Sequence, residues 1–445
     1  MAFEQRQPLA LGAGLFYPGG EHVTAWRSAD AVPEQYLDLD YYAHFAQTAE
    51  AGTFATVFIA DELYVWDRFA SGISHGVNVR PEPFTLLSAL SQLTSKIGLA
   101  ATISSTYNEP YHVARKLASL DHLSHGRAAW NLVTSASDEE ARNFGRDSNL
   151  DHAVRYRRAE EFVDVVTGLW DSWDGDAFLY NRASGLFADR TKLHVLDHHG
   201  EFHSVRGPLN VPRPPQGHPV LFQAGASEAG RALAGRTAEA VFTISPNDLT
   251  GAQQLYSEYK ARATGAGRSA DDLRVLPALL PIIGRTEEDA EERFREIARL
   301  TPDQVSLDLL SHHLDADLSD RDPDEKFVFD FDPENFNQVR SVYSSIAAML
   351  EQRDYTLREL YNTLLRQRFR LGTPDSHAAW IADRYEQHAA DGFIVMFSTL
   401  PDGLDDFVEH IVPRLIDRGV YRAEYAGDTL RENLGLERPA GRYAA

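Results

Sequence analysis

The sequence predicts an α/β fold, a (β/α)8 TIM barrel with insertions before its fifth and eighth strands. Short runs of Val, Ile, Leu and Ala alternate with helix-length amphipathic segments, the pattern of a buried parallel sheet covered by helices. Eight such units fit in 445 residues, a length that one barrel can occupy. An open dinucleotide-binding sheet is disfavoured, because Tyr17 stands where the third glycine of a G-x-G-x-x-G pattern starting at Gly12 is needed.

The elements follow in order along the chain. Each expected strand is a short apolar run, and these runs are residues 9–17, 55–60, 98–104, 128–134, 219–223, 240–244, 275–283 and 393–397. Each expected helix is an amphipathic segment after its strand, and these segments are residues 41–51, 83–94, 111–123, 151–170, 228–235, 250–264, 287–301 and 404–418. A barrel of this kind places its catalytic residues at the carboxyl ends of the strands.

Two stretches exceed a minimal barrel, residues 174–207 and residues 302–370, and we expect them to be insertions in one domain that spans residues 1–445. Residues 301–335 contain eleven Asp and Glu but only two basic residues, a net charge of −9. Such a segment is typical of a solvated surface. An active-site lid is the other interpretation, favoured by its aromatic residues Phe327, Phe329, Phe331 and Phe336.

Composition excludes several functional classes. With 43 Lys and Arg against 66 Asp and Glu, the net charge of −23 disfavours nucleic acids and anionic membranes and favours a small-molecule partner. The absence of cysteine excludes disulfides, thiolate nucleophiles and iron–sulfur clusters, so redox chemistry would need a bound cofactor. The N-terminus does not resemble a signal peptide and no apolar run is long enough to cross a bilayer, so we expect a cytoplasmic protein.

The turn after the fifth strand is the first candidate site. Small residues run from Ala224 to Ala226, Ser227 follows, and a helical pattern starts at once. Such a turn lets backbone N–H groups and a helix N-terminus bind a phosphate. Two alternatives stay open: Ser227 is a hydrolase nucleophile in an imperfect G-x-S-x-G motif, or it only caps the helix.

Four further residues are candidates by position. Asp61 follows the second strand, where barrels place functional carboxylates, although it would also serve as a cap. Thr102 lies near the end of the third strand and shares one face with Ser104. His152 and Tyr156 lie four residues apart on one face of a helix, near its N-terminus, where they could contact an anion. An ordinary surface or packing role is the alternative for His152.

The histidine-rich segment 197–203 suggests a metal site only superficially. Adjacent histidines on a strand point to opposite faces, and the segment contains no recognised ligand spacing. We therefore expect no metal.

Several ordered motifs resemble one known family over nearly the whole chain, most weakly across residues 302–370. These motifs are residues 25–27 (AWR), 101–107 (ATISSTY), 110–115 (PYHVAR), 126–127 (GR), 130–135 (WNLVTS), 141–145 (ARNFG), 197–200 (DHHG), 206–209 (RGPL), 223–225 (QAG) and 429–436 (TLRENLGL). They resemble the flavin-dependent monooxygenases that include the nitrilotriacetate, EDTA and dibenzothiophene-sulfone enzymes, within the bacterial-luciferase-like barrels.

The resemblance implies a cofactor and partners. The cofactor is FMN in its reduced form, O2 is the co-substrate, and a separate NAD(P)H-dependent flavin reductase supplies the reduced flavin. Asp61 and Thr102 match flavin contacts near the ring system, His152 and Tyr156 match contacts on the fourth helix, and Ser227 matches the phosphate contact. His152 is also the candidate catalytic residue, as a proton carrier. The family also implies a homodimer or homotetramer and no metal.

The implied reaction is oxygenation of a carbon beside sulfur or nitrogen, with cleavage of the C–S or C–N bond. Tyr17, Tyr64, Trp66 and Phe69 follow the first two strands and suggest an aromatic pocket. No cluster of Arg and Lys for a polycarboxylate is visible, so we expect an aromatic or organosulfur substrate. The alternatives are a deazaflavin-dependent oxidoreductase on the same barrel, a serine hydrolase that uses Ser227, and a flavin-binding protein without activity.

Overall fold

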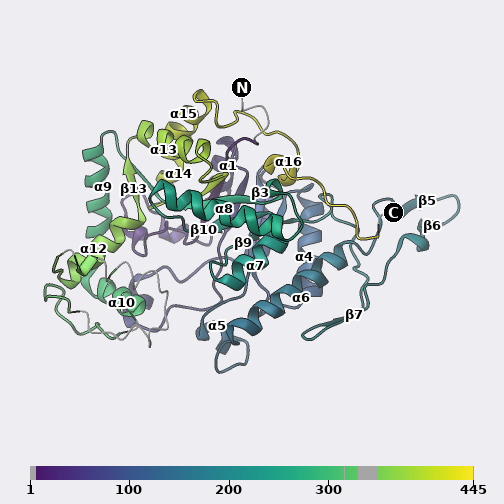
Figure 1. Ribbon diagram of the computed structural model, residues 1–445, viewed down its shortest axis with the longest axis horizontal. Coiled ribbons are helices and arrows are strands. Elements are labelled where there is room, and N and C mark those ends of the chain that lie inside the picture. The colour runs from purple at the N-terminus through teal and green to yellow at the C-terminus, as the bar shows by residue number, and fades with distance from the viewer. Residues whose placement is uncertain (1–6, 315, 329–345, 347–348, 352, 444–445) are drawn as a thin grey trace.

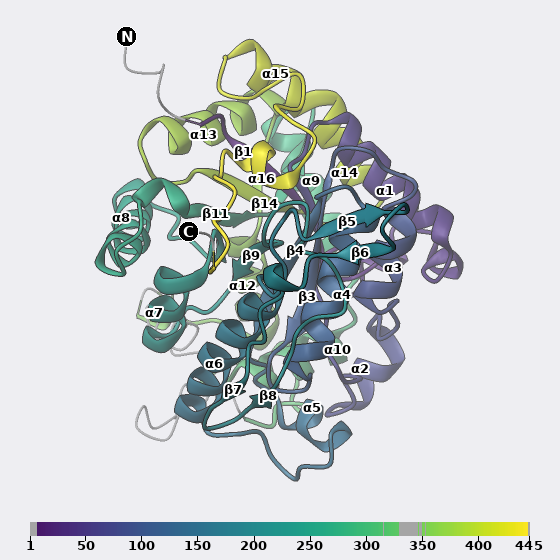
Figure 2. The same cartoon turned by 90° about the vertical axis from the view of Figure 1, so that its right-hand side faces the viewer.

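A closed barrel of eight parallel strands forms the centre of the molecule (Figures 1 and 2). The computed structural model describes residues 7–314, 316–328, 346, 349–351 and 353–443. Around the barrel the strands run in the order β1, β14, β11, β10, β9, β4, β3 and β2. Their bounds are β1 Ala10–Leu15, β2 Thr56–Ile59, β3 Gly98–Ser104, β4 Ala128–Val133, β9 Val220–Gln223, β10 Ala240–Thr243, β11 Arg274–Leu279 and β14 Gly392–Met396. The predicted fold class is confirmed, and each expected strand overlaps one of these eight.

Helices surround the barrel on its outside (Figure 2). They are α1 Leu39–Ala51, α2 Ala70–His75, α3 Pro83–Leu90, α4 Pro110–Leu123, α5 Asp138–Asn143, α6 His152–Trp170, α7 Glu228–Thr237, α8 Leu249–Gly265, α9 Glu287–Arg299, α10 Asp303–Leu314, α12 Leu357–Arg368, α13 Pro374–Glu386, α14 Asp402–Asp406, α15 Val412–Asp417 and α16 Leu430–Leu434. No helix in the described ranges is long and apolar enough to cross a membrane.

Side chains alternate between the two faces of each barrel strand. On β1, Leu11, Ala13 and Leu15 belong to the apolar layer between strands and helices. Gly12 and Gly14 face inwards, and a Cβ on Gly14 would lie 2.9 Å from Ile394 Cγ2. These glycines therefore make room for large side chains of β14 inside the barrel.

Aromatic rings fill the barrel below its carboxyl end. Phe58 lies 5.7 Å from Phe222 and 5.5 Å from Phe242, and Phe16 lies 5.6 Å from Phe242, measured between ring centroids. This packed cluster closes the interior, so any ligand of the barrel must bind above it, at the carboxyl ends of the strands.

Two expected elements are divided in the structure. The apolar run 275–283 forms β11 and then a separate strand, β12 Pro281–Ile283, which pairs with β13 Arg370–Gly372 outside the barrel. Pro281 has no N–H to donate to a barrel neighbour, which favours the break. The expected helix 404–418 contains a π-helical segment, Phe407–Ile411, between α14 and α15. Pro413 follows it and cannot donate the regular helical hydrogen bond.

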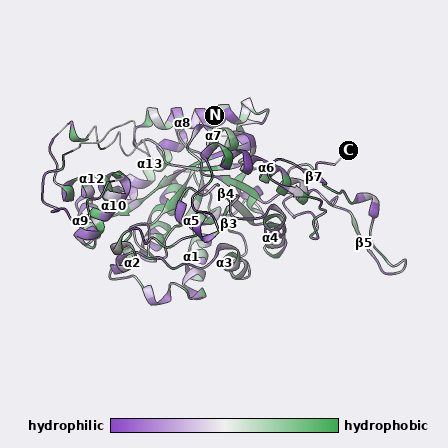
Figure 3. Cartoon of the chain, turned by 90° about the horizontal axis from the view of Figure 1, so that it is seen from below, coloured by the Kyte–Doolittle hydropathy of each residue, from purple (hydrophilic) through white to green (hydrophobic). Residues whose placement is uncertain are grey.

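Both expected insertions are present. Residues 174–207 form two hairpins, β5 Phe178–Asn181 with β6 Leu186–Ala188 and β7 His198–His199 with β8 Ser204–Val205, and the first of these projects away from the barrel (Figures 1 and 3). In the second insertion, apolar residues of α10 and α12 pack in the same cluster as the barrel interior. Phe327 is buried, whereas Phe329, Phe331 and Phe336 lie outside the described residues.

Candidate active site

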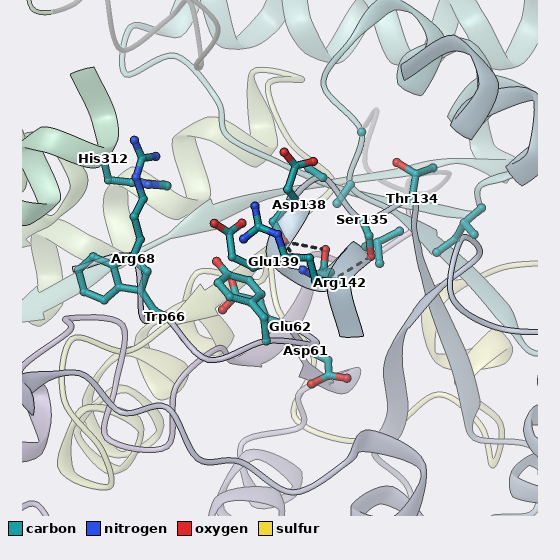
Figure 4. Close-up of a pocket in the computed structure, with 18 of the residues that line it drawn as sticks. Asp61, Glu62, Trp66, Arg68, Thr134, Ser135, Asp138, Glu139, Arg142 and His312 are labelled. Atoms are coloured by element: carbon teal, nitrogen blue, oxygen red, sulfur yellow. Dashed lines mark hydrogen bonds between the residues drawn. The ribbon is translucent and has the colours of Figure 1, made fainter. Parts of the chain in front are cut away.

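A large cavity of about 660 Å³ opens at the carboxyl ends of the barrel strands (Figure 4). Asp61 and Glu62 after β2, residues 132–135 at the end of β4, and residues 223–225 at the end of β9 contribute to its wall. Trp66, Arg68, residues of α5 and of the loop before it, Tyr156 of α6 and His312 of α10 also line it. This space, called the first cavity below, lies where a barrel places its active site.

Asp61 connects two spaces at this end of the barrel. It lines the first cavity and also a smaller neighbouring cavity of about 180 Å³, whose wall includes Thr102. Burial raises the pKa of the Asp61 carboxyl to about 7, and the nearby Glu82 and Glu140 add to the effect while Arg80 opposes it. Asp61 therefore titrates near neutral pH, in a position to face a ligand of either cavity.

Replacement of Asp61 by asparagine tests this environment. The pKa of Asp61 is higher in the folded protein than in the unfolded chain. The free energy of unfolding therefore falls as pH rises from about 4 to about 7 and Asp61 ionises. At pH 8 the Asp61→Asn variant should therefore unfold at a higher urea concentration than the wild type, with a free energy of unfolding about 1–2 kcal/mol larger. This difference should shrink at pH 5. A gain that is independent of pH would show that Asp61 has an ordinary pKa.

Two buried amide side chains, Asn131 and Gln223, were not among the predicted site residues. Asn131 on β4 donates from Nδ2 to Thr102 Oγ1 at 2.9 Å, while its Oδ1 has no hydrogen-bond partner among the described residues. Gln223 at the end of β9 is likewise buried, and its Oε1 also has no partner there. Such polar side chains near the ends of barrel strands are a signal that could have identified both residues.

The loop after β4 is held in a rare backbone conformation beside the first cavity. Ser135 has φ 54°, which few residues other than glycine adopt. Its Oγ lies 2.9 Å from Ser104 Oγ and 3.1 Å from Glu140 Oε1, and Glu140 also accepts a hydrogen bond from Leu63 N. These bonds fix the loop after β4 against the end of β3 and the loop after β2.

The turn between β9 and α7 packs unusually closely against α6. A Cβ on Gly225 would lie 2.8 Å from the Tyr156 hydroxyl and 2.9 Å from Gly230 Cα, so only glycine fits. Ser227 caps α7, and its Oγ accepts a hydrogen bond from Gly230 N at 3.1 Å. The capping interpretation of Ser227 is thus confirmed. The nucleophile interpretation has no support, because no histidine in the described part of the chain hydrogen-bonds to Ser227.

His152 lies at the edge of this arrangement. It is the first residue of α6, is exposed, and its ring centroid lies 4.8 Å from that of Tyr156. The structure therefore brings Asp61, Thr102 and Tyr156 to the cavities, whereas Ser227 and His152 flank the turn beside Tyr156.

The histidine-rich segment 197–203 is bound to α6 by one carboxylate. Glu161 lies 2.9 Å from His198 Nε2 and accepts hydrogen bonds from the backbone N–H groups of Phe202 and His203. Among the residues that the structure describes, no group of three or more His, Asp or Glu side chains is arranged to hold a metal ion.

A second cavity, of about 270 Å³, lies between the barrel and the second insertion. Tyr17, Tyr64 and Trp66 line it as expected, but Phe69 does not. Its opposite wall comes from α10 and α12, so this part of the insertion is more than a solvated surface. Arg80 and Arg368 also line it, and each is paired with a glutamate, Glu62 and Glu21 respectively.

Comparison with known proteins agrees with this geometry. The family described as luciferase-like monooxygenase matches residues 21–392. N-acetyl-S-(2-succino)cysteine monooxygenase of Bacillus subtilis is 46% identical over 97% of this chain and 98% of its own. Nitrilotriacetate monooxygenase component A of Aminobacter aminovorans is 42% identical over 96% of both chains. EDTA monooxygenase from Chelativorans sp. BNC1 superposes with a TM-score of 0.81 and 31% identity over 97% of this chain and 99% of its own. The chain therefore belongs to the luciferase-like monooxygenase family.

Proposed function

We propose that this protein is the oxygenase component of a two-component system and binds reduced FMN in the first cavity. Reduced FMN and O2 are the cofactor and co-substrate that membership of this family implies. The observation that carries the proposal is the extent of the first cavity. It reaches from Asp61 after β2 to Gly225 in the turn before α7, so a single space offers room for both a ring system and a phosphate.

Residues at the ring end suit a flavin. The pyrimidine edge of the flavin ring carries N–H and C=O groups. Asn131 Oδ1 is a buried acceptor without a partner in the described residues, and Asn131 donates to Thr102, which lines the small cavity, so a donor bound there would satisfy it. Gln223, which lines the first cavity next to Gly225, has a second such acceptor at Oε1. We infer that Asp61 and Thr102 border the same end of the ring, because both line the adjoining small cavity.

The β9–α7 turn suits the phosphate. Its small residues expose backbone N–H groups at the N-terminus of α7, where the helix dipole favours an anion. We infer that the Ser227 and Tyr156 hydroxyls donate to the phosphate and that His152 lies close enough to contribute charge or hold a proton. The bound flavin would supply the electrons that activate O2, while this chain orients it and excludes water.

Removal of the two hydroxyl groups tests the phosphate assignment. Ser227→Ala and Tyr156→Phe should each weaken the binding of reduced FMN about tenfold, since each removes a charge-assisted hydrogen bond. Anaerobic fluorescence titration would measure the affinity. Ser269→Ala, which removes a helix cap that does not line the first cavity, is the matched control and should not change the affinity. Unchanged affinity in both test variants would place the phosphate elsewhere.

The finer parts of the proposal concern substrate and partners. We propose oxygenation of an aromatic or organosulfur substrate with cleavage of a C–S or C–N bond, and supply of reduced FMN by a separate flavin reductase. A homodimer or homotetramer is part of the same proposal. The exposed Tyr180, Leu186 and Phe187 of the projecting hairpin offer apolar surface for self-association. Substrate turnover without O2 would favour the deazaflavin alternative instead.

A further inference from the structure

The second cavity ends at a polar pair that the proposed flavin site does not use. Glu62, Tyr64, Trp66 and His312 line both cavities, so the two spaces adjoin there. Glu21 and Arg368 line only the second cavity. This pair therefore marks the part of the second cavity that is not shared with the first.

Glu21 has an unused acceptor. The residue follows β1 and is only 9% exposed. It is bound by Arg368, whose Nη2 lies 2.5 Å from Glu21 Oε1, but Glu21 Oε2 has no hydrogen-bond partner among the described residues. A buried carboxylate oxygen without a partner is costly, and a ligand that donates a hydrogen bond would remove that cost.

Arg368 supplies donors beside this acceptor. It is the last residue of α12, its side chain is 50% exposed, and its bond to Glu21 leaves other guanidinium N–H groups for a ligand. A donor and an acceptor side by side match an amide group, which has both a C=O and an N–H. A carboxylate has only acceptors and would face Glu21, and an alkyl group has neither.

The rest of the wall of the second cavity contains both polar and apolar side chains. Burial lowers the pKa of His313 to about 4 and that of His22 to about 3, so both histidines are neutral at pH 7. Glu62 Oε2 lies 3.3 Å from Arg80 Nη2, so the charges of these two lining residues cancel each other. The apolar part of the wall is formed by Val23, Val77, Leu309, Leu310, Leu364 and Leu365.

We propose that the second cavity binds the organic substrate and that Glu21 and Arg368 select substrates with an amide group at the end remote from the oxygenated carbon. The proposal rests on the proposed function, which places the flavin in the first cavity. An apolar or thioether body would pack against the apolar residues of the second cavity, and the reacting carbon would lie where the two cavities adjoin.

Binding without turnover tests this selection. Anaerobic calorimetry in the presence of reduced FMN, where the absence of O2 prevents turnover, would compare three ligands on one thioether chain: 4-(methylthio)butanamide, 4-(methylthio)butanoate and 5-(methylthio)pentan-2-one. The amide should bind about tenfold more tightly than the carboxylate and the ketone. In Glu21→Gln, the new side chain would turn its oxygen to Arg368 and its NH2 to the ligand, so the preference for amide over carboxylate should fall at least about tenfold.

The matched control is the same change at an exposed glutamate. Glu288→Gln alters a residue of α9 that does not line the second cavity, and it should leave all three affinities unchanged. Equal affinities in the wild type, no detectable binding of any ligand, or an unchanged preference in Glu21→Gln would each overturn the proposal. A separate titration with reduced FMN in the absence of these ligands reports on the flavin site, so failure of either proposal is recognised independently.

Discussion

Replacement of Gly225 by valine should abolish tight binding of reduced FMN while the barrel remains folded. A Cβ at this position would lie 2.4 Å from Gln223 Nε2, 2.8 Å from the Tyr156 hydroxyl and 2.9 Å from Gly230 Cα. Because Gly230 Cα belongs to the backbone of α7, the contact cannot be relieved by rotation of a side chain. The turn and the N-terminus of α7 must shift, and the donors that we assign to the phosphate shift with them. We expect a loss of about a hundredfold in affinity, equivalent to about 2.7 kcal/mol.

Anaerobic titration with reduced FMN would measure this loss, and circular dichroism would confirm the fold. Gly175→Val is the matched control, because a Cβ on this exposed glycine meets no atom within 4 Å. It should bind reduced FMN as the wild type does. A Gly225→Val variant that is folded and retains its affinity would contradict the assignment of the phosphate to this turn.

Replacement of Arg431 by methionine should have the largest effect on stability, without an effect on the flavin site. Arg431, in α16, is 3% exposed and lies at the amino end of the barrel. Its Nη2 donates to Glu239 Oε2 and to the His218 carbonyl, both at 2.9 Å. Its backbone N–H donates to Gln216, which in turn donates to the buried Asp121. Loss of the guanidinium leaves Glu239 without its cation, at a cost of about 3–5 kcal/mol.

Urea unfolding would measure the cost. The double variant Arg431→Met with Glu239→Gln should recover part of the lost stability, because the amide keeps an acceptor for Leu221 N without an unpaired charge. Arg299→Met is the control, since it breaks an exposed ion pair with Glu292 and should cost at most about 1 kcal/mol. A loss of affinity for FMN in folded Arg431→Met would show that the two ends of the barrel are coupled.

The barrel could be predicted because each of its strands has a local sequence pattern. Each strand is a short apolar run, and all eight runs overlap strands of the closed sheet. The predicted boundaries were wrong where a proline changes the backbone, as at Pro281, where the chain leaves the barrel, and near Pro413, where the helix widens. Helix α13 was not predicted, since the insertion before it obscured the eighth unit.

Site residues could be predicted from the sequence only where a polar side chain lies at the carboxyl end of a predicted strand. Asp61 and Thr102 come at such positions, and the structure places both at one cavity. Glu21 and Arg368 are 347 positions apart, and only the folding of α12 over the barrel brings them together. Likewise, Gly225 indicates a close backbone approach only once Tyr156 is seen against it.

Rapid mixing of the protein–FMNH2 complex with oxygenated buffer tests the central claim most directly. The protein is prepared anaerobically in excess over the reduced flavin, and the flavin spectrum is followed in time. A first cavity that binds reduced FMN and controls its reaction with O2 predicts oxidation in kinetically distinct phases that free FMNH2 does not show, and Gly225→Val should behave like free flavin. Oxidation in the wild type that matches free FMNH2 at saturating protein would contradict the oxygenase assignment.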